Sequence, residues 1–222
     1  MSVSRVTEAA TRWRWYGGCP LDPDAAVLDR WRAGDQVAGR ELFARYFDQL
    51  YRFFANKCEE TDELIQATFF AIVKSVDRFE GRSSFRTYLF AIARNELYRY
   101  LRERKRTAAF DPALSSIAEL ATSAGSQIAR NQEQECLFAA LRTLPVEQQS
   151  LVELHYWEEL DALALAEIFE LSATAVRKRL SRARAALREA MAARGGAPPA
   201  ALQSDDALER WARGAATMPH MP

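Results

Sequence analysis

Aromatic rings and cationic side chains alternate along one stretch, Arg78 to Arg106, which reads RFEGRSSFRTYLFAIARNELYRYLRERKR. Arginines alone would suit the phosphates of duplex DNA, whereas rings placed among them offer stacking platforms for unpaired bases. Asn95 adds an amide that can pair with the Watson–Crick edge of an exposed base. For any single ring, burial on the apolar stripe of a helix is an equally good interpretation. The stretch as a whole favours contact with single-stranded or melting DNA.

A second cationic segment has the form of a helix-turn-helix. Residues 160–185, LDALALAEIFELSATAVRKRLSRARA, predict a first helix that ends near Glu170, a short turn, and a second helix capped by Ser172. Apolar residues at 4-3-4 spacing would face a core and leave the cations outside. A recognition helix of this kind enters a major groove, where arginine can bind guanine with two hydrogen bonds. A basic, solvated helix without a ligand is the alternative.

The charges are strongly segregated, although 30 Lys and Arg balance 30 Asp and Glu. From Arg82 to Arg106 and from Ser172 to Arg194 the chain is rich in Lys and Arg and nearly free of carboxylates, which suggests two separate contacts with polyanions. Between them, residues 145–171 contain no Lys or Arg and seven carboxylates. These are Glu147, Glu153, Glu158, Glu159, Asp161, Glu167 and Glu170.

Apolar residues recur at helical spacing through most of the chain, and no segment alternates convincingly with period two. The sequence therefore predicts an all-α fold with two small helical domains joined by a flexible linker. We expect an N-terminal extension at 1–24, a helical bundle at 25–106, a linker at 107–131, a helix-turn-helix domain at 132–194 and a tail at 195–222. The linker is poor in charge and in large apolar residues.

Cysteine, histidine and hydropathy patterns exclude several classes of protein. Cys19, Cys58 and Cys136 are odd in number and widely spaced, so neither a disulfide framework nor a zinc site is expected. The longest strongly apolar run, residues 64–73, is too short to span a bilayer, and the N-terminus lacks the apolar core of a signal peptide. We expect a cytoplasmic protein with no membrane insertion, no metal and no cofactor.

The ordered segments resemble a known family. ELFARYFDQLYRF, DELIQATFFAIVKSVDRFEG and SSFRTYLFAIARN, followed by LRTLPVEQQSLVELHYWEELDALALAEIF and SATAVRKRLSRARAALREAM, resemble the bacterial RNA polymerase sigma factors of the extracytoplasmic-function type. The resemblance covers about two thirds of the chain. It implies that the protein binds core RNA polymerase, recognises the −35 and −10 promoter elements and promotes DNA melting. It also implies an anti-sigma factor as partner, and a linker that threads the RNA exit path of the polymerase.

The resemblance assigns residues to three surfaces. The helix over residues 63–74 would dock on the clamp coiled coil of the largest polymerase subunit, through Glu63, Leu64, Gln66 and Phe69. The −10 element and the melted strand would contact Phe79, Arg82, Ser83, Phe85, Arg86, Tyr88, Arg94, Asn95 and Arg99. The −35 duplex would contact Ser172, Thr174, Arg177, Lys178, Arg179, Arg182 and Arg184. Arg99 stands where the family commonly has Asp or Asn, so the −10 sequence preference stays open.

Two other functions are compatible with parts of the sequence. A freestanding helix-turn-helix regulator would bind duplex DNA without polymerase, but it leaves the aromatic and cationic stretch without a role. A helical enzyme could use Asp22 and Asp24, or Glu158, Glu159 and Asp161, as metal ligands. No Gly-rich phosphate loop or nucleophile–base pair accompanies these carboxylates, so no catalytic role is predicted.

Overall fold

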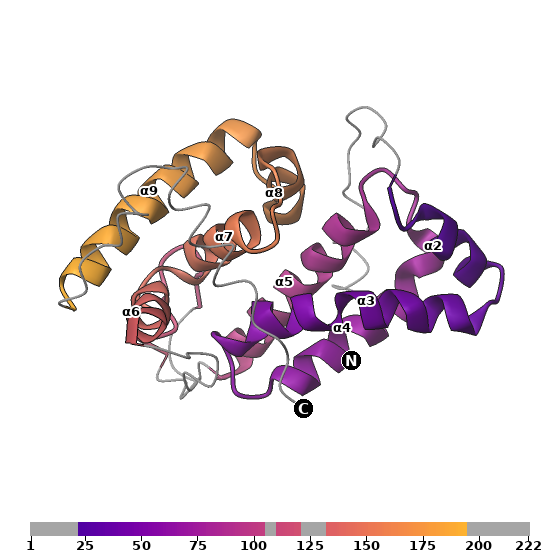
Figure 1. The fold of residues 1–222 in the computed structure, drawn as a ribbon, viewed down its shortest axis with the longest axis horizontal. Coiled ribbons are helices and arrows are strands. Elements are labelled where there is room, and N and C mark those ends of the chain that lie inside the picture. The colour runs from indigo at the N-terminus through magenta and orange to yellow at the C-terminus, as the bar shows by residue number, and fades with distance from the viewer. Residues whose placement is uncertain (1–21, 105–109, 121–131, 195–222) are drawn as a thin grey trace.

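The computed structural model describes residues 22–104, 110–120 and 132–194, and these residues form two groups of helices (Figure 1). The N-terminal unit consists of α2 to α5 and the C-terminal unit of α6 to α9. The helices are α2 (Ala25–Arg32), α3 (Gln36–Ala55), α4 (Thr61–Ser75), the short 3-10 helix η1 (Val76–Arg78), α5 (Phe85–Arg104), α6 (Gln132–Leu141), α7 (Val146–Tyr156), α8 (Ala162–Phe169) and α9 (Ala173–Ala192). No strand occurs within the described ranges, which confirms the all-α prediction. The predicted extension and tail lie almost wholly outside them.

Local sequence explains where the helices of the N-terminal unit begin and how closely they approach. Asp35 caps α3 because its carboxylate accepts hydrogen bonds from the backbone N–H groups of Val37 (2.9 Å) and Ala38 (3.3 Å). Gly39 lies where a Cβ atom would come within 2.7 Å of the Trp31 indole. The absence of a side chain at this position lets α2 pack tightly on α3.

The helix-turn-helix has the boundaries that the sequence predicts. Asp161 caps α8 through the N–H groups of Leu163 (3.0 Å) and Ala164 (2.8 Å). Glu170 ends α8 in the left-handed region, with a φ of 56°, and this residue turns the chain toward α9. The Ser172 hydroxyl then accepts a hydrogen bond from Ala175 N at 3.1 Å and caps α9.

Part of the predicted linker is packed on the C-terminal unit. In residues 110–120, the carbonyl oxygens of Ser115 and Pro112 accept hydrogen bonds from the first two N–H groups of α7, each at 2.9 Å. Ile117 is fully buried in the same segment. These N–H groups have no partner within their own helix. Residues 110–120 of the predicted linker therefore complete the start of α7 and fill the core beside it.

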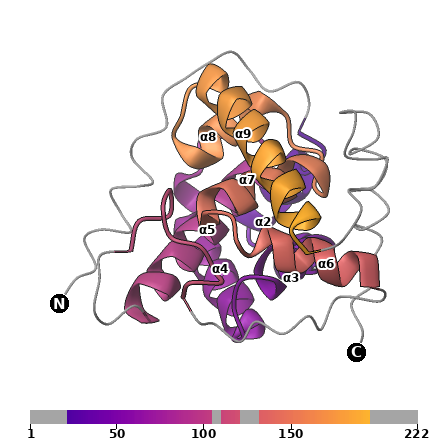
Figure 2. The same cartoon turned by 90° about the vertical axis from the view of Figure 1, so that its left-hand side faces the viewer.

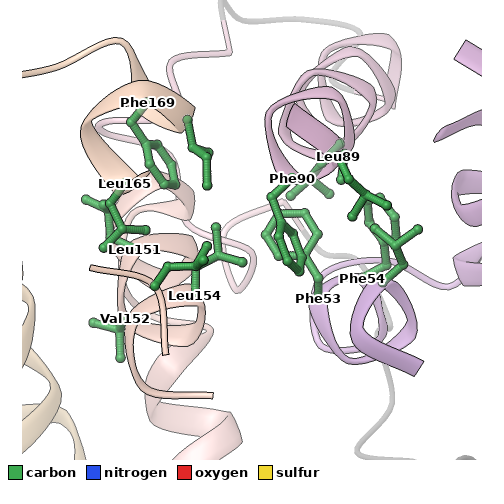
Figure 3. Packing of buried hydrophobic residues seen from close by; sticks show 14 of the residues in the cluster. Phe53, Phe54, Leu89, Phe90, Leu151, Val152, Leu154, Leu165 and Phe169 are labelled. Carbon is green, nitrogen blue, oxygen red and sulfur yellow. The ribbon is translucent and has the colours of Figure 1, made fainter. Parts of the chain in front are cut away.

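The two units pack on one another through α5 with α8 and α3 with α7. Both views place α7 between α9 and the N-terminal unit (Figure 1, Figure 2). Figure 3 shows buried side chains from the two sides of this boundary, with Phe53, Phe54, Leu89 and Phe90 on α3 and α5, and Leu151, Val152, Leu154, Leu165 and Phe169 on α7 and α8. They belong to one continuous apolar cluster.

Candidate nucleic-acid interface

Arg32, the last residue of α2, anchors the start of the loop over residues 79–84. The Arg32 guanidinium donates hydrogen bonds to the carbonyl oxygens of Val76 (2.9 Å and 3.2 Å) and Phe79. It also lies over the Phe79 ring, 5.6 Å from the centroid. The sequence did not single out Arg32, because the residues it binds lie 44 and 47 positions further along the chain.

Three rings expected to stack on unpaired bases are buried in this structure. Phe79 stacks on Tyr88 with a centroid separation of 4.6 Å, and Phe85 lies in the core with no exposed surface. Tyr88 binds Ser75 through its hydroxyl, and burial raises the pKa of its phenol. In this arrangement the three rings fill the N-terminal core, and their stacking on unpaired bases stays a prediction.

The first turn of α5 is capped from a distant part of the chain. Asp22 accepts a hydrogen bond from Phe85 N at 2.6 Å, and its other carboxylate oxygen accepts one from Asp24 N at 3.1 Å. In addition, Ser84 Oγ accepts from Thr87 N at 3.1 Å. Together these contacts fix the direction in which α5 leaves the loop.

Arg94 and Asn95 lie at the boundary between the two units. Arg94 is 7% exposed and donates to the carbonyl oxygen of Ile168 and to the Glu170 carboxylate, the latter at 2.9 Å. It also donates to Asn95 Oδ1 at 2.7 Å and 3.1 Å. The Arg94 side chain is therefore covered by α8, and the Asn95 oxygen that could accept from a base is already bonded.

The remaining residues predicted for the −10 element differ in their surroundings. Arg82 is exposed and forms an ion pair with Glu80. Arg86 is half-buried and donates to Gln49 (3.0 Å) and to Glu158 of the C-terminal unit (2.8 Å). The Ser83 hydroxyl donates a hydrogen bond to the Glu167 carboxylate of α8. Burial raises the pKa of that carboxyl by more than this hydrogen bond lowers it. Arg99 is exposed and pairs with Glu96 and, at 3.8 Å, Glu103.

The helix α9 presents a cationic face opposite its buried one. The side chains of Val176, Leu180, Ala183, Leu187 and Met191 are buried. Thr174 and the cations Arg177, Lys178 and Arg182 are exposed. Arg179 is partly exposed and forms an ion pair with Glu147 of α7, whereas Arg184 donates to the Tyr156 hydroxyl at 3.2 Å. Arg179 and Arg184 are therefore held by α7, whereas Arg177, Lys178 and Arg182 are exposed, a distinction that the sequence pattern did not make.

The helix α4 carries the residues predicted to bind polymerase. Glu63 and Gln66 are exposed, Leu64 is buried, and Phe69 is half-buried and stacks on Phe43 at 4.2 Å. Two large apolar side chains are also exposed on α4: Phe70 at 59% and Val73 at 48%. Sequence reasoning missed this pair, although the inward positions Ile65, Thr68 and Ile72 imply by helical geometry that Phe70 and Val73 point outward.

The carboxylates considered as metal ligands have structural partners instead. Asp24 is buried against Arg45 and the Tyr46 hydroxyl, Asp161 caps α8, and Glu158 pairs with two arginines. Within the described ranges no group of three or more potential ligands could hold a metal ion. Cys58 is buried, and burial raises its pKa to about 12, so its sulfur stays a thiol. None of the described helices is long and apolar enough to cross a membrane.

Two family models match the two units separately. The model of sigma-70 region 2 matches residues 42–107, and that of sigma-70 region 4 matches residues 134–187. The chain belongs to the extracytoplasmic-function sigma factors. It is 25% identical over 172 residues to the ECF RNA polymerase sigma-E factor of Haemophilus influenzae. This matched region covers 72% of this chain and 91% of that protein. The protein of the same name from Escherichia coli K12 is also 25% identical, over 175 residues, 74% of this chain and 92% of the relative.

Solved structures agree with this assignment. The sigma factor resembles CnrH, which was solved in complex with the cytosolic domain of CnrY. The TM-score is 0.59, and the two chains are 26% identical over 78% of this chain and 99% of CnrH. RpoE of Bartonella quintana, solved with the anti-sigma factor NepR, has the same fold, with a TM-score of 0.54 and 22% identity over 68% of this chain and 95% of the other. The sigma factor therefore acts in transcription initiation.

Proposed function

We propose that this sigma factor reads the −35 duplex with the exposed cations of α9. The observation that carries the proposal is the placement of Arg177, Lys178 and Arg182 on the open face of a capped helix-turn-helix, opposite its buried stripe. Arginine near the start of such a helix can bind guanine in the major groove, and the following cations can bind phosphates. Arg179 and Arg184 orient α9 on α7 in this proposal, in addition to any contact with DNA.

The −10 element and the melted strand are assigned to the loop 79–84 and to α5. Arg82 and Arg99 are exposed there, and Arg86, Arg94 and Asn95 follow the same helix toward the C-terminal unit. Guanidinium groups would bind the strand backbone, and the Asn95 amide would bind a base edge. The buried rings Phe79, Phe85 and Tyr88 would support the loop through the N-terminal core.

Core RNA polymerase is the proposed partner of α4. The exposed pair Phe70 and Val73 extends the predicted surface of Glu63 and Gln66, and an exposed apolar pair beside polar residues suits a protein contact. We place the site of action in the cytoplasm, where bacterial RNA polymerase works, and we assign the chain no catalysis of its own. RpoE of Bartonella quintana was solved with an anti-sigma factor, and we propose a partner of that class here as well.

Run-off transcription tests the proposal directly. Purified protein and core RNA polymerase are combined on a library of randomised promoters, and transcripts are sequenced. A sigma factor yields transcripts that start downstream of a shared pair of sequence elements. Duplex binding without polymerase, together with no transcript, would instead favour a freestanding regulator. The recovered elements also supply the duplex and the single strand that the other experiments need.

A further inference from the structure

The short helix α2 holds the start of the loop over residues 79–84. Its last residue, Arg32, donates hydrogen bonds to the carbonyl oxygen of Val76, at 2.9 Å and 3.2 Å, and to that of Phe79. Two nitrogens of the guanidinium, Nε and Nη2, are thereby directed at the backbone that leads into the loop. The course of the chain into the loop is therefore set by the C-terminal end of α2.

The chain just before α2 holds the other end of the loop. Asp22 accepts a hydrogen bond from the backbone N–H of Phe85, the first residue of α5, at 2.6 Å, and its second oxygen accepts one from Asp24 N at 3.1 Å. Ser84 also caps this turn, but its hydroxyl accepts from Thr87 N. The Phe85 N–H has no acceptor within its own helix. It is therefore satisfied by Asp22, 63 positions earlier in the chain.

Both ends of α2 are in turn fixed on α3. Before its start, Asp24 is 1% exposed and accepts hydrogen bonds from Arg45 and from the Tyr46 hydroxyl. Near its end, the Trp31 indole packs so closely on Gly39 that a Cβ atom there would come within 2.7 Å of it. A helix of eight residues has a fixed length of about 12 Å. The helix α2 therefore sets the distance between the two anchors of the loop.

Neither anchor is suited to contact DNA itself. The Asp22 carboxylate would repel phosphates, and Arg32 is half-buried with its guanidinium directed at backbone carbonyls. Both residues also precede the part of the chain, residues 42–107, that matches sigma-70 region 2. Any influence of these two residues on promoter DNA must therefore act through the loop that they hold.

We infer that Asp22 and Arg32 are positioning residues for promoter opening, because they clamp the two ends of the loop over residues 79–84 in the shape that receives an unpaired base. This inference rests on the proposed function of the loop. An ordered loop loses little conformational freedom when it binds, whereas a released loop must first be ordered. Contacts to a base also need a more closely defined geometry than contacts to phosphates. The clamp therefore raises both the rate of promoter opening and the preference for the correct −10 base.

The test compares Asp22→Ala with Asp22→Asn in the polymerase holoenzyme. Both substitutions remove the carboxylate charge, but only asparagine keeps an oxygen that can accept from the Phe85 N–H. The rate of open-complex formation is measured on the promoter recovered from the randomised library and on the same promoter with one −10 base changed. The ratio of the two rates is the readout, because a smaller folded fraction lowers both rates equally. Asp22→Ala should lower the ratio by about three- to tenfold, as expected for a lost capping hydrogen bond, and Asp22→Asn by less than about twofold.

The second anchor is tested in the same assay. Arg32→Met removes the donors and should lower the ratio, whereas Arg32→Lys keeps a charge and a donor and should lower it less. An unchanged ratio in folded Asp22→Ala would overturn the inference. An equal fall with alanine and asparagine would also overturn it, because the effect would then belong to the charge. Should Asp22→Ala fail to fold, Arg32→Met decides by the same ratio, and an unchanged ratio there would count equally against the clamp.

Substitutions in the loop itself separate this inference from the function on which it rests. Arg82→Ala/Ser83→Ala changes two side chains of the loop without touching either anchor. If the wild type transcribes but this variant keeps the full −10 preference, the assignment of the loop to the −10 element fails, and the inference fails with it. If the ratio responds to this variant but not to Asp22→Ala or Arg32→Met, the assignment stands and the clamp is refuted.

Discussion

Lys57, two residues beyond the end of α3, and Glu153 on α7 form an ion pair in which the two side chains are 0% and 1% exposed. Burial lowers the pKa of Lys57 and raises that of Glu153, and the attraction between the two groups opposes both shifts. Gln149 also donates to Glu153, at 2.9 Å. Because an isolated buried charge is strongly unfavourable, each partner makes the burial of the other possible only while α3 and α7 stay in contact.

Removal of one member of this pair is expected to destabilise the protein more than removal of both. Glu153→Ala leaves Lys57 buried without a counter-ion and should lower the free energy of unfolding by about 3–5 kcal/mol. Separation of the two units, which would let water reach Lys57, sets the upper limit of this loss. Lys57→Met/Glu153→Leu replaces the pair with apolar groups and should recover most of the loss. Urea denaturation of the wild type, the single variant and the double variant measures both effects. A double variant as unstable as the single one would contradict this account.

The packed segment before α6 can be tested with two leucine-sized side chains that lie close together. Ile117 has no exposed surface, whereas Leu114 is 75% exposed. Ile117→Ala should lower the free energy of unfolding by about 2–5 kcal/mol through loss of burial and the cavity left behind. Leu114→Ala should change it by less than about 0.5 kcal/mol. Thermal and chemical denaturation would reveal equal effects if the segment were unpacked in solution.

Recognition of the −35 element should depend on Arg177 more than on general charge. Arg177→Ala is expected to weaken binding of the −35 duplex by about 1–3 kcal/mol if a specific base contact is lost. Arg40→Ala removes another exposed cation, from α3, and serves as the control. Footprinting of the polymerase holoenzyme on the selected promoter gives the readout. Full −35 protection with the Arg177 variant would refute the assignment.

Asn95 should act after the promoter is first bound. Asn95→Ala removes the amide proposed to contact an unpaired base, so the rate of open-complex formation should fall while closed-complex affinity is preserved. Extrusion of a base costs a few kcal/mol, and a template with a mismatched bubble removes most of that cost. The variant should therefore regain most of its activity on the bubble template, in a run-off assay beside the wild type. No rescue would mean that Asn95 has another role.

Polymerase binding should depend on the exposed apolar pair of α4. Phe70→Glu places a charge in the proposed contact and should weaken the affinity for core polymerase by at least about tenfold, since buried aromatic anchors commonly contribute 2 kcal/mol or more. Val37→Glu is the matched control, because Val37 is 57% exposed but lies on α3 rather than on α4. Fluorescence anisotropy with labelled sigma factor gives both affinities. An equal effect of the two substitutions would remove α4 from the interface.

The helices and the helix-turn-helix could be predicted from sequence because their determinants are local. Val176, Leu180 and Ala183 repeat at helical spacing, and Ser172 and Asp161 are strong capping residues next to the helices they begin. The same periodicity could not tell a stacking ring from a core ring. Both occur on one stripe of α5, and only the packing against α3 shows that Phe85 is buried.

The boundary between the units could not be predicted in this way. Its ion pairs join residues separated by 72 to 106 positions, such as Arg86 with Glu158 and Arg52 with Glu158. The segregation of charge into blocks is visible in the sequence. The sequence does not show that the acidic block packs against cations of the other unit. The same guanidinium groups can bind either DNA phosphates or carboxylates. The sequence pattern indicated only the DNA contact, because it does not show which segments lie side by side.

The Arg32 guanidinium holds the start of the loop at residues 79–84 through the carbonyl oxygens of Val76 and Phe79 and through the Phe79 ring, and none of these contacts involves the side chains at positions 80 to 83. An anchor of this kind is indifferent to which side chains the exposed part of the loop carries. Positions 80, 82 and 83 could therefore diverge among relatives, or be randomised in a selection, while the loop keeps its course; Gly81, with a φ of 67°, should stay glycine. On the proposed function of this loop, its side chains could change the promoter preference while its backbone anchor stays the same.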